Sequence, residues 1–195
     1  MTGSDRLAQL RQRADWTYEG RTLQGWAGEL ARGNDEALGV LPRLGPALVP
    51  ALRERFRAAG QVLREQPAPG PEEVWLWTAR RPHAAAAARG RIALALERLG
   101  PAAGPAVPEL SAALDDLHVC ESWSVGDRLG GTARQVHVCA RAAAALRAIG
   151  SPRARAALAR VRDSQRVVAR ACDPLDPEGG VPITLARVVA GGLDR

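Results

Sequence analysis

Three segments of the chain share one pattern, and this internal repetition limits the fold more than any other feature of the sequence. In each segment an apolar stretch ends in Leu-Gly or Ile-Gly, proline follows within two residues, and a second stretch of helix-forming residues comes next. The three segments are Glu36–Leu52, Arg91–Leu114 and Ala140–Val161. Glycine can end a helix in the left-handed conformation, and proline is tolerated in the first turn of the following helix. The pattern therefore predicts a two-helix hairpin that occurs three times.

Aligned glycines give the spacing of this predicted hairpin. They are Gly45, Gly100 and Gly150, which lie 55 and 50 residues apart. In the third copy, Ser151 is the predicted N-cap and Pro152 the first residue of the second helix.

Composition favours helices in a single domain of 195 residues. Aromatic residues make up only 4% of the chain, and Ile, Phe and Tyr are scarce, which lowers the average β-strand propensity. Ala, Leu and Arg are abundant and are good helix formers. With 46% hydrophobic residues the chain is too apolar for a disordered protein. We therefore predict an all-α fold.

Apolar residues also recur at helical spacing, which predicts four buried stripes. The stripes are Leu23, Trp26, Ala27 and Leu30; Ala85, Ala88, Ile92, Leu96 and Leu99; Val107, Leu110, Leu114 and Leu117; and Cys139, Ala142, Leu146 and Ile149.

The repeated string A-x-A-L-x-x-[LI]-G-P-A, followed by A-[VL]-P-x-L, resembles HEAT-like repeats, including the bacterial group named after phycobilisome lyase subunits. The string Y-E-G-R-T-L-Q-G-W at Tyr18–Trp26 is similar to the lead-in before the first repeat of many such proteins. The resemblance covers roughly residues 18–171 and implies a short α-solenoid of about three αα-hairpin repeats. Its first helices would line the convex face and its second helices the concave face. Capping helices are expected at Thr2–Ala14 and Val181–Ala190.

Two insertions lengthen the repeats beyond the usual size of HEAT units. They span Gly60–Pro82 and Asp115–Ala133. Each follows the second helix of one repeat and precedes the first helix of the next repeat. We therefore expect them side by side on one edge of the solenoid. The first contains a candidate short helix at Glu72–Arg80, and the glycines of the second indicate a loop.

Tryptophan is concentrated in these insertions and provides candidate binding residues. Trp75, Trp77 and Trp123 lie there, and Arg80 and Arg81 follow the first pair. Tryptophan and arginine are enriched among the residues that dominate protein interfaces. The structural alternative is that the tryptophans clamp the insertions onto the solenoid.

Positive charge is concentrated toward the C-terminal part of the chain. All 27 basic residues are arginines, and residues 134–170 hold nine of them against one acid, whereas residues 71–127 carry a net charge of −3. The candidate phosphate-binding residues are Arg153, Arg155, Arg160 and Arg162 on the second helix of the third repeat, with Arg166 and Arg170 on a further helix. The alternative is a solvated face. HEAT-like DNA glycosylases hold DNA in a basic concave groove, but no catalytic residue of that family can be aligned here.

The string His-Val-Cys occurs twice, at His118–Cys120 and His137–Cys139, and is the candidate metal site. Zinc spacings such as C-x-x-C are absent from the sequence. On a helix, His137 and Cys139 would face apart, which predicts a buried thiol beside an exposed imidazole. We therefore predict no bound metal and no cofactor.

Acidic residues lie near both insertions, where they either complement helix dipoles or form a general acid–base pair. They are Glu72, Glu73, Asp115, Asp116, Glu121 and Asp127. The chain has no Ser-His-Asp set, phosphate loop or H-E-x-x-H motif.

The remaining sequence features indicate a cytoplasmic protein that does not enter the membrane. Three cysteines without paired spacing argue against a disulfide framework, and neither a signal core nor a run of 18 apolar residues occurs.

We predict a binding protein that uses the insertion edge and concave face to hold a protein partner. The alternatives are nucleic-acid binding through residues 134–170, and a small-molecule enzyme or lyase-type subunit with its site at the insertions.

Overall fold

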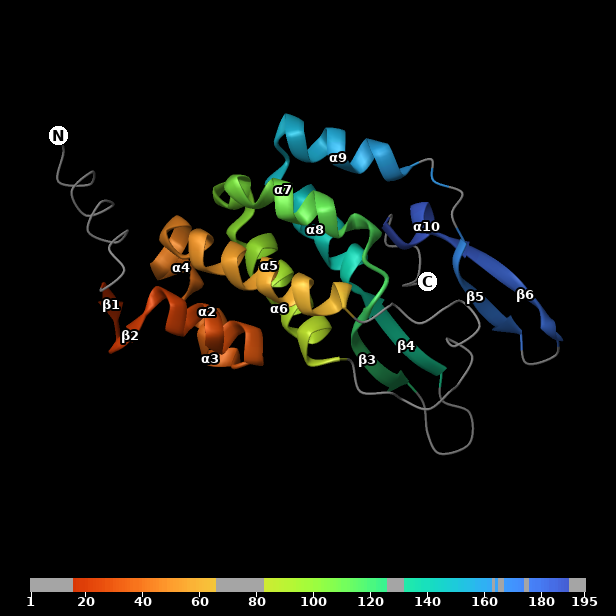
Figure 1. Cartoon of the computed structure of the whole chain (residues 1–195), viewed down its shortest axis with the longest axis horizontal. Coiled ribbons are helices and arrows are strands. Elements are labelled where there is room, and N and C mark those ends of the chain that lie inside the picture. The colour runs from red at the N-terminus through yellow and green to blue at the C-terminus, as the bar shows by residue number, and fades with distance from the viewer. Residues whose placement is uncertain are drawn as a thin grey trace.

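The computed structural model of the chain describes residues 16–65, 83–125, 132–162, 164, 167–173 and 176–189 (Figure 1). This part is mostly helical, as the composition predicts. The α-helices are α2 (Leu23–Arg32), α3 (Asp35–Gly39), α4 (Leu41–Leu44), α5 (Val49–Arg64), α6 (Ala84–Leu99), α7 (Val107–Ala112), α8 (Val138–Ile149), α9 (Pro152–Arg162) and α10 (Leu185–Val189). The 3-10 helices are η1 (Gly45–Leu48), η3 (Gly100–Ala106) and η4 (Ala113–Asp115).

Within the described ranges, three antiparallel two-stranded sheets accompany the helices. They pair β1 (Thr17–Tyr18) with β2 (Arg21–Thr22), β3 (Val119–Val125) with β4 (Thr132–His137), and β5 (Val167–Asp173) with β6 (Asp176–Thr184). The prediction of a loop at Asp115–Ala133 was therefore wrong, because β3 and the start of β4 fall within it. The C-terminal cap at Val181–Ala190 was also partly wrong, since residues 181–184 belong to β6 and helix α10 begins only at Leu185.

Helix α6 lies at the centre of the described helices and packs against α2, α5 and α8 (Figure 1). Fully buried alanines line this contact region, with Ala86, Ala93 and Ala95 on α6 and Ala142, Ala143 and Ala145 on α8. Alanine adds little bulk between helices, so their backbones can approach closely. Helix α9 packs on α7, α8 and α10 and lies along the outer edge of the helical body.

Most residues of the predicted stripes form the core. Trp26, Ala27, Leu30, Ile92, Leu96, Val107, Leu110, Leu114, Cys139, Ala142, Leu146 and Ile149 are buried. Leu23, Ala85, Ala88, Leu99 and Leu117 are partly buried. The period of 3.6 residues therefore identified the inward faces of these helices correctly.

The aligned glycines do not share one conformation. Gly150 ends α8 in the left-handed region, with φ 63° and ψ 5°, and the Ser151 hydroxyl accepts a 3.2 Å hydrogen bond from Ala154 N, as predicted. Gly45 and Gly100 have φ of 54° and 55° but ψ of −141° and −132°. The predicted left-handed caps at these two glycines were wrong, because each precedes a proline, which disfavours a helical ψ in the preceding residue.

Other predicted features fall differently from expectation or outside the described residues. Residues 60–64 of the first insertion are the last turn of α5. The rest of that insertion, residues 66–82, and the predicted cap at Thr2–Ala14 lie outside the described residues. No helix in the described ranges is long and apolar enough to cross a bilayer.

Candidate functional site

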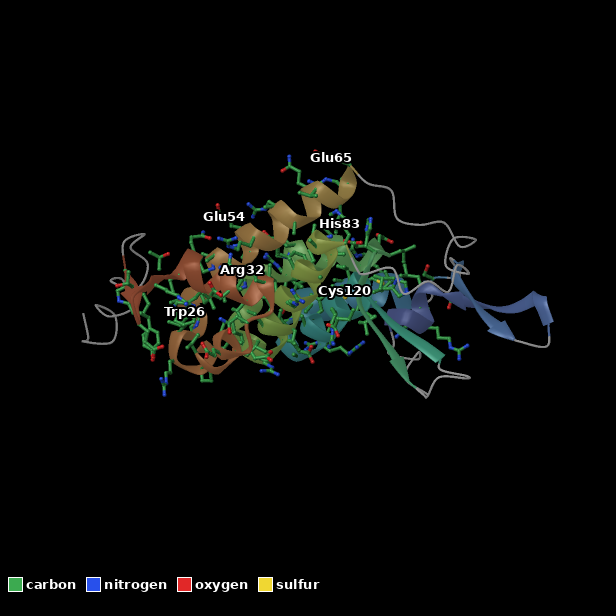
Figure 2. All side chains as sticks on the ribbon, turned by 90° about the horizontal axis from the view of Figure 1, so that it is seen from below. Trp26, Arg32, Glu54, Glu65, His83 and Cys120 are labelled. Atoms are coloured by element: carbon green, nitrogen blue, oxygen red, sulfur yellow. The ribbon has the colours of Figure 1, made fainter. Side chains whose placement is uncertain are left out.

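Strands β3 and β4 form a hairpin that projects from one end of the helical body, and we call these two strands the arm (Figures 1 and 2). Val119 pairs with His137, and Trp123 pairs with Arg134. Beyond this pairing, Val138 N donates to His118 O at 3.0 Å and Cys139 N donates to Asp116 O at 2.9 Å. The two His-Val-Cys strings therefore run side by side at the base of the arm.

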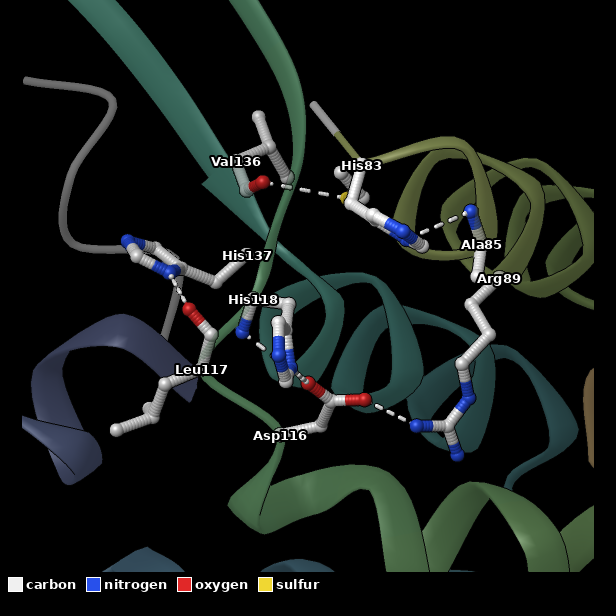
Figure 3. A network of polar contacts seen from close by, with 9 residues as sticks. His83, Ala85, Arg89, Asp116, Leu117, His118, Val136 and His137 are labelled. Carbon is white, nitrogen blue, oxygen red and sulfur yellow. Dashed lines mark hydrogen bonds and ion pairs between the residues drawn. The ribbon is translucent and has the colours of Figure 1, made fainter. Parts of the chain in front are cut away.

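Asp116 is the centre of a buried polar network at this base (Figure 3). One carboxylate oxygen forms an ion pair with the Arg89 guanidinium of α6. The other lies 2.8 Å from His118 Nδ1 and accepts a 3.1 Å hydrogen bond from His118 N. The carboxylate thus joins α6 to the connection that leads into β3.

Arg89 occupies a site made by α5. Its guanidinium carbon lies 4.3 Å from the centre of the Phe56 ring, within the range of a cation–π contact. A Cβ on Gly60 would come within 2.9 Å of the same carbon, so glycine there leaves room for the guanidinium. Burial lowers the pKa of Arg89, and Asp116 opposes this shift. The ion pair therefore offsets part of the cost of burying the charge.

A second set of contacts fixes β3 against α6 and α8. The Arg141 guanidinium donates to both carboxylate oxygens of Glu121, from Nε at 2.9 Å and from Nη2 at 2.7 Å. Cys120 is buried and its Sγ lies 3.2 Å from Val136 O. A Cβ on Gly90 would lie 2.7 Å from both Cys120 Cβ and Sγ, so β3 lies directly against the α6 backbone.

The repeated thiols are held in their protonated form. Burial, followed by the Glu121 charge, raises the pKa of Cys120 to about 12. Burial, followed by the Asp116 charge, raises the pKa of Cys139 to about 12. Zinc ligands and nucleophiles are thiolates, so both cysteines have the properties of buried structural residues.

His137 is the clearest correction to the sequence reading of this region. It was expected to be exposed on a helix, but α8 begins only at Val138 and His137 ends β4 with 5% of its surface exposed. Its Nδ1 lies 2.7 Å from Leu117 O. Burial lowers the pKa of His137, and the contact with Leu117 O opposes this shift. Among the described residues, no group of three or more His, Cys, Asp or Glu could hold a metal ion.

The structure leaves most of the predicted aromatic site unplaced. Trp75, Trp77, Arg80 and Arg81 lie outside the described residues, as do the predicted acid–base candidates Glu72, Glu73 and Asp127. Only the main chain of Trp123 is described, in the middle of β3. Asp116 and Glu121 are both paired with arginines, and Asp115 is exposed.

Four of the predicted phosphate-binding arginines lie on α9. Arg153, Arg155, Arg160 and Arg162 are all exposed. Arg170 lies on strand β5, so the predicted helix for it was wrong, and Arg166 lies outside the described residues. The six predicted arginines therefore do not share one helical surface.

Sequence reasoning missed Arg89 as a key residue, although a signal was present. Arg89 lies four residues after Ala85 and three before Ile92, so it falls within the predicted apolar stripe. A charge inside such a stripe indicates either that the stripe is interrupted or that the charge is buried in an ion pair.

Comparison with protein-family models, curated proteins and solved structures gives no significant match for this chain.

Proposed function

We propose that the chain is a non-catalytic binding protein with a HEAT-like α-solenoid as its scaffold, and that the arm binds a protein partner. The observation that carries this proposal is the attachment of the arm. Buried charges from α6 and paired charges from α8 join the base of the arm to the helical body.

Such an attachment has a cost that a mere connection between helices would not require. A two-stranded hairpin is marginal in water on its own, and a buried ion pair is expensive to form. The Asp116–Arg89 and Glu121–Arg141 pairs give the arm a fixed base. A fixed hairpin presents strand edges and side chains in one orientation, which lowers the entropy lost on binding.

Residue types in the arm suit a protein interface. Trp123 and Arg134 are paired across the two strands, and buried tryptophan and arginine often dominate binding energy. Trp75, Trp77, Arg80 and Arg81 remain further candidate binding residues of this proposal, and they lie outside the described residues.

The junctions between helices support a repeated scaffold. Gly45 and Gly100 have nearly the same φ and ψ, and each is followed by proline and a 3-10 turn. The next helix then begins with Val49-Pro50 in one case and Val107-Pro108 in the other. The two glycines are 55 residues apart and the two Val-Pro pairs 58 apart, because η3 is three residues longer than η1. The two junctions thus share a glycine conformation and a Val-Pro helix start, as related repeats would, and differ in the length of the 3-10 turn between them.

Side-chain chemistry at the arm favours binding over catalysis. Cys120 and Cys139, with pKa values of about 12, are poor nucleophiles at neutral pH. His137 is buried against Leu117 O, and the carboxylates of Asp116 and Glu121 hold arginines. These groups are engaged in holding the arm.

The proposal can be tested by site-specific crosslinking in cells of the source organism. An aromatic photo-crosslinking residue, which keeps a large aromatic side chain at the position, replaces Trp123 in one version and Ala58, an exposed alanine of α5, in the matched control. We expect one protein to crosslink selectively at position 123. With that partner purified, Trp123→Ala should weaken binding about thirtyfold, which corresponds to about 2 kcal/mol for a central interface tryptophan.

Two results would contradict the proposal. One is the absence of any protein that crosslinks at position 123 above the level seen at position 58. The other is a purified partner that binds Trp123→Ala as tightly as the wild-type chain.

A further inference from the structure

Beyond the proposed protein binding at the arm, we infer that helix α9 binds duplex DNA by lying in the major groove and contacting phosphates on both sides. The first observation is charge. Residues 138–162, which form α8 and α9, contain six arginines and no Asp or Glu. Four of the six are the exposed arginines of α9.

The arginines of α9 form two rows rather than one patch. Arg153 and Arg160 are seven residues apart, as are Arg155 and Arg162. At 3.6 residues per turn, each pair lies on one side of the helix, and the two rows are about 160° apart around the axis. The buried residues Ala154, Ala157 and Val161 fill the inward face between the rows.

The outward face between the rows carries small side chains. They are those of Pro152, Ala156 and Ala159, all exposed. These residues add little width, so the α9 backbone can approach a ligand surface closely while the longer arginines reach to both sides.

These dimensions match the major groove of B-DNA. A helix with its side chains is about 10–12 Å across, and the major groove is about 12 Å wide. Residues seven apart on one row are separated by about 10.5 Å along the helix axis, a distance over which each row can follow one phosphate backbone. A helix in the groove would therefore place one row against each strand.

The ends of the arginine side chains are compatible with this role. The Arg155 guanidinium donates one hydrogen bond, from Nη1 to Gly150 O at the start of α9. A guanidinium has five N–H donors, so this bond orients the group and leaves donors for phosphate. All four side chains are long enough to reach outward from an exposed position.

The same geometry indicates what kind of nucleic acid is bound. Pro152, Ala156 and Ala159 offer no hydrogen-bonding groups to base edges, and the arginines contact phosphates in this arrangement, so binding should depend little on sequence. The major groove of duplex RNA is deep and narrow and does not admit side chains. The partner class is therefore duplex DNA, bound through its backbone.

The test uses the full chain and a labelled 20-base-pair DNA duplex of arbitrary sequence, followed by fluorescence anisotropy between 50 and 200 mM salt. Four phosphate contacts predict a slope of log K against log salt of about −3.6, or about a 150-fold loss of affinity over this range. Arg153→Ala/Arg160→Ala and Arg155→Ala/Arg162→Ala should each reduce the slope to about −1.8, or about a 12-fold loss.

Two matched controls separate a groove-binding helix from general attraction between charges. Arg64→Ala/Arg98→Ala removes the same charge from exposed positions of α5 and α6 and should leave the slope unchanged. Ala156→Glu places a carboxylate between the two rows and should abolish binding, whereas Ala58→Glu, on exposed α5, should preserve most of it.

Several outcomes would overturn the inference. One is the absence of DNA binding at 50 mM salt, and another is an equal effect of the α9 variants and the control variants. A third is a shallower slope of log K against log salt in only one of the two row variants. The fourth is binding of duplex RNA or single-stranded DNA as tight as the binding of duplex DNA. Binding of a polyglutamate peptide through both rows, without DNA binding, would assign α9 to an acidic protein instead.

Discussion

Arg89 lies in the buried stripe of α6, and its position explains why Asp116 is needed beside it. Only 8% of the Arg89 surface is exposed. An unpaired charge at such a position would be strongly destabilising, whereas an ion pair with Asp116 offsets the loss of hydration. The space for the guanidinium comes from Gly60, and its flat face lies over Phe56. One charged residue in the core is thus accommodated by residues at three other positions, Asp116, Phe56 and Gly60.

Replacing Asp116 by Asn should test this dependence. Asp116→Asn keeps the shape of the side chain but leaves the Arg89 charge buried without its partner. We expect the free energy of unfolding to fall by about 3–5 kcal/mol, measured by urea denaturation. Arg98→Ala, an exposed change on the same helix, should alter it by less than about 0.5 kcal/mol. Equal effects of the two variants would show that the pair has no special role.

His137 should make the stability of the fold sensitive to mild acid. Burial lowers the pKa of His137 below its usual value of 6.5, while Leu117 O and Asp116 oppose the shift. Between the folded pKa and 6.5, the unfolded chain binds more protons than the folded chain. The stability contributed by neutral His137 is therefore present above about pH 6.5 and is lost as pH falls, by at most about 1.4 kcal/mol per pH unit.

The variant His137→Asn isolates this contribution, because the Asn amide can donate to Leu117 O without titrating. Unfolding free energies of both proteins should be measured from pH 8 to pH 5. The wild-type chain should lose stability relative to the variant as the pH falls. Parallel pH profiles would mean that His137 does not titrate differently on folding.

At the scale of elements, the helices were predictable and the arm was not. Each long helix carries an apolar stripe with the helical period, and Ala, Leu and Arg favour that conformation. The arm arises from local sequence that the overall composition conceals. Val119, Glu121, Trp123 and Val125 alternate with smaller residues, as in a β-strand. The glycines between residues 126 and 131 were interpreted as a loop, although a short glycine-rich stretch between alternating segments is also typical of a hairpin.

Gly90 should be required for the contact between the arm and α6. A Cβ there would lie 2.7 Å from Cys120 Cβ and Sγ. In an ordinary helix interior, replacing glycine by alanine stabilises the fold by up to about 1 kcal/mol. In Gly90→Ala, overpacking should outweigh this gain and lower the free energy of unfolding by about 1–2 kcal/mol.

Gly39→Ala is the matched control for this substitution. Gly39 is the last residue of α3, and nothing lies within 4 Å of the position that its Cβ would take. This variant should be as stable as the wild-type chain or more so in urea denaturation. A Gly90→Ala protein that is equally stable would show that the arm can move away from α6 at no cost.

At the scale of the whole molecule, the helical body carries the two separate surfaces for which we propose binding. The arm projects from one end, and α9 lies along the outer edge (Figure 1). The repeated Leu-Gly-Pro junctions made the body predictable, because glycine and proline restrict the backbone locally. Ion pairs such as Arg53–Glu109, which joins α5 to α7 at 2.8 Å, were not predictable. They connect residues 56 positions apart in the sequence, and a single sequence contains no direct record of such contacts.

We conclude that the helical body holds the arm in an ordered state, and amide hydrogen exchange reports on that order residue by residue. In the wild-type chain, the amides of Val138 and Cys139 and the paired amides of β3 and β4 should exchange at least about 100-fold more slowly than in unstructured peptides. In Asp116→Asn, their protection should fall because the network at the base of the arm is broken, whereas in Arg98→Ala, an exposed change on α6, it should stay as in the wild-type chain. An arm that exchanges like an unstructured peptide in the wild-type chain, or that keeps its full protection in Asp116→Asn, would show that the helical body does not hold it.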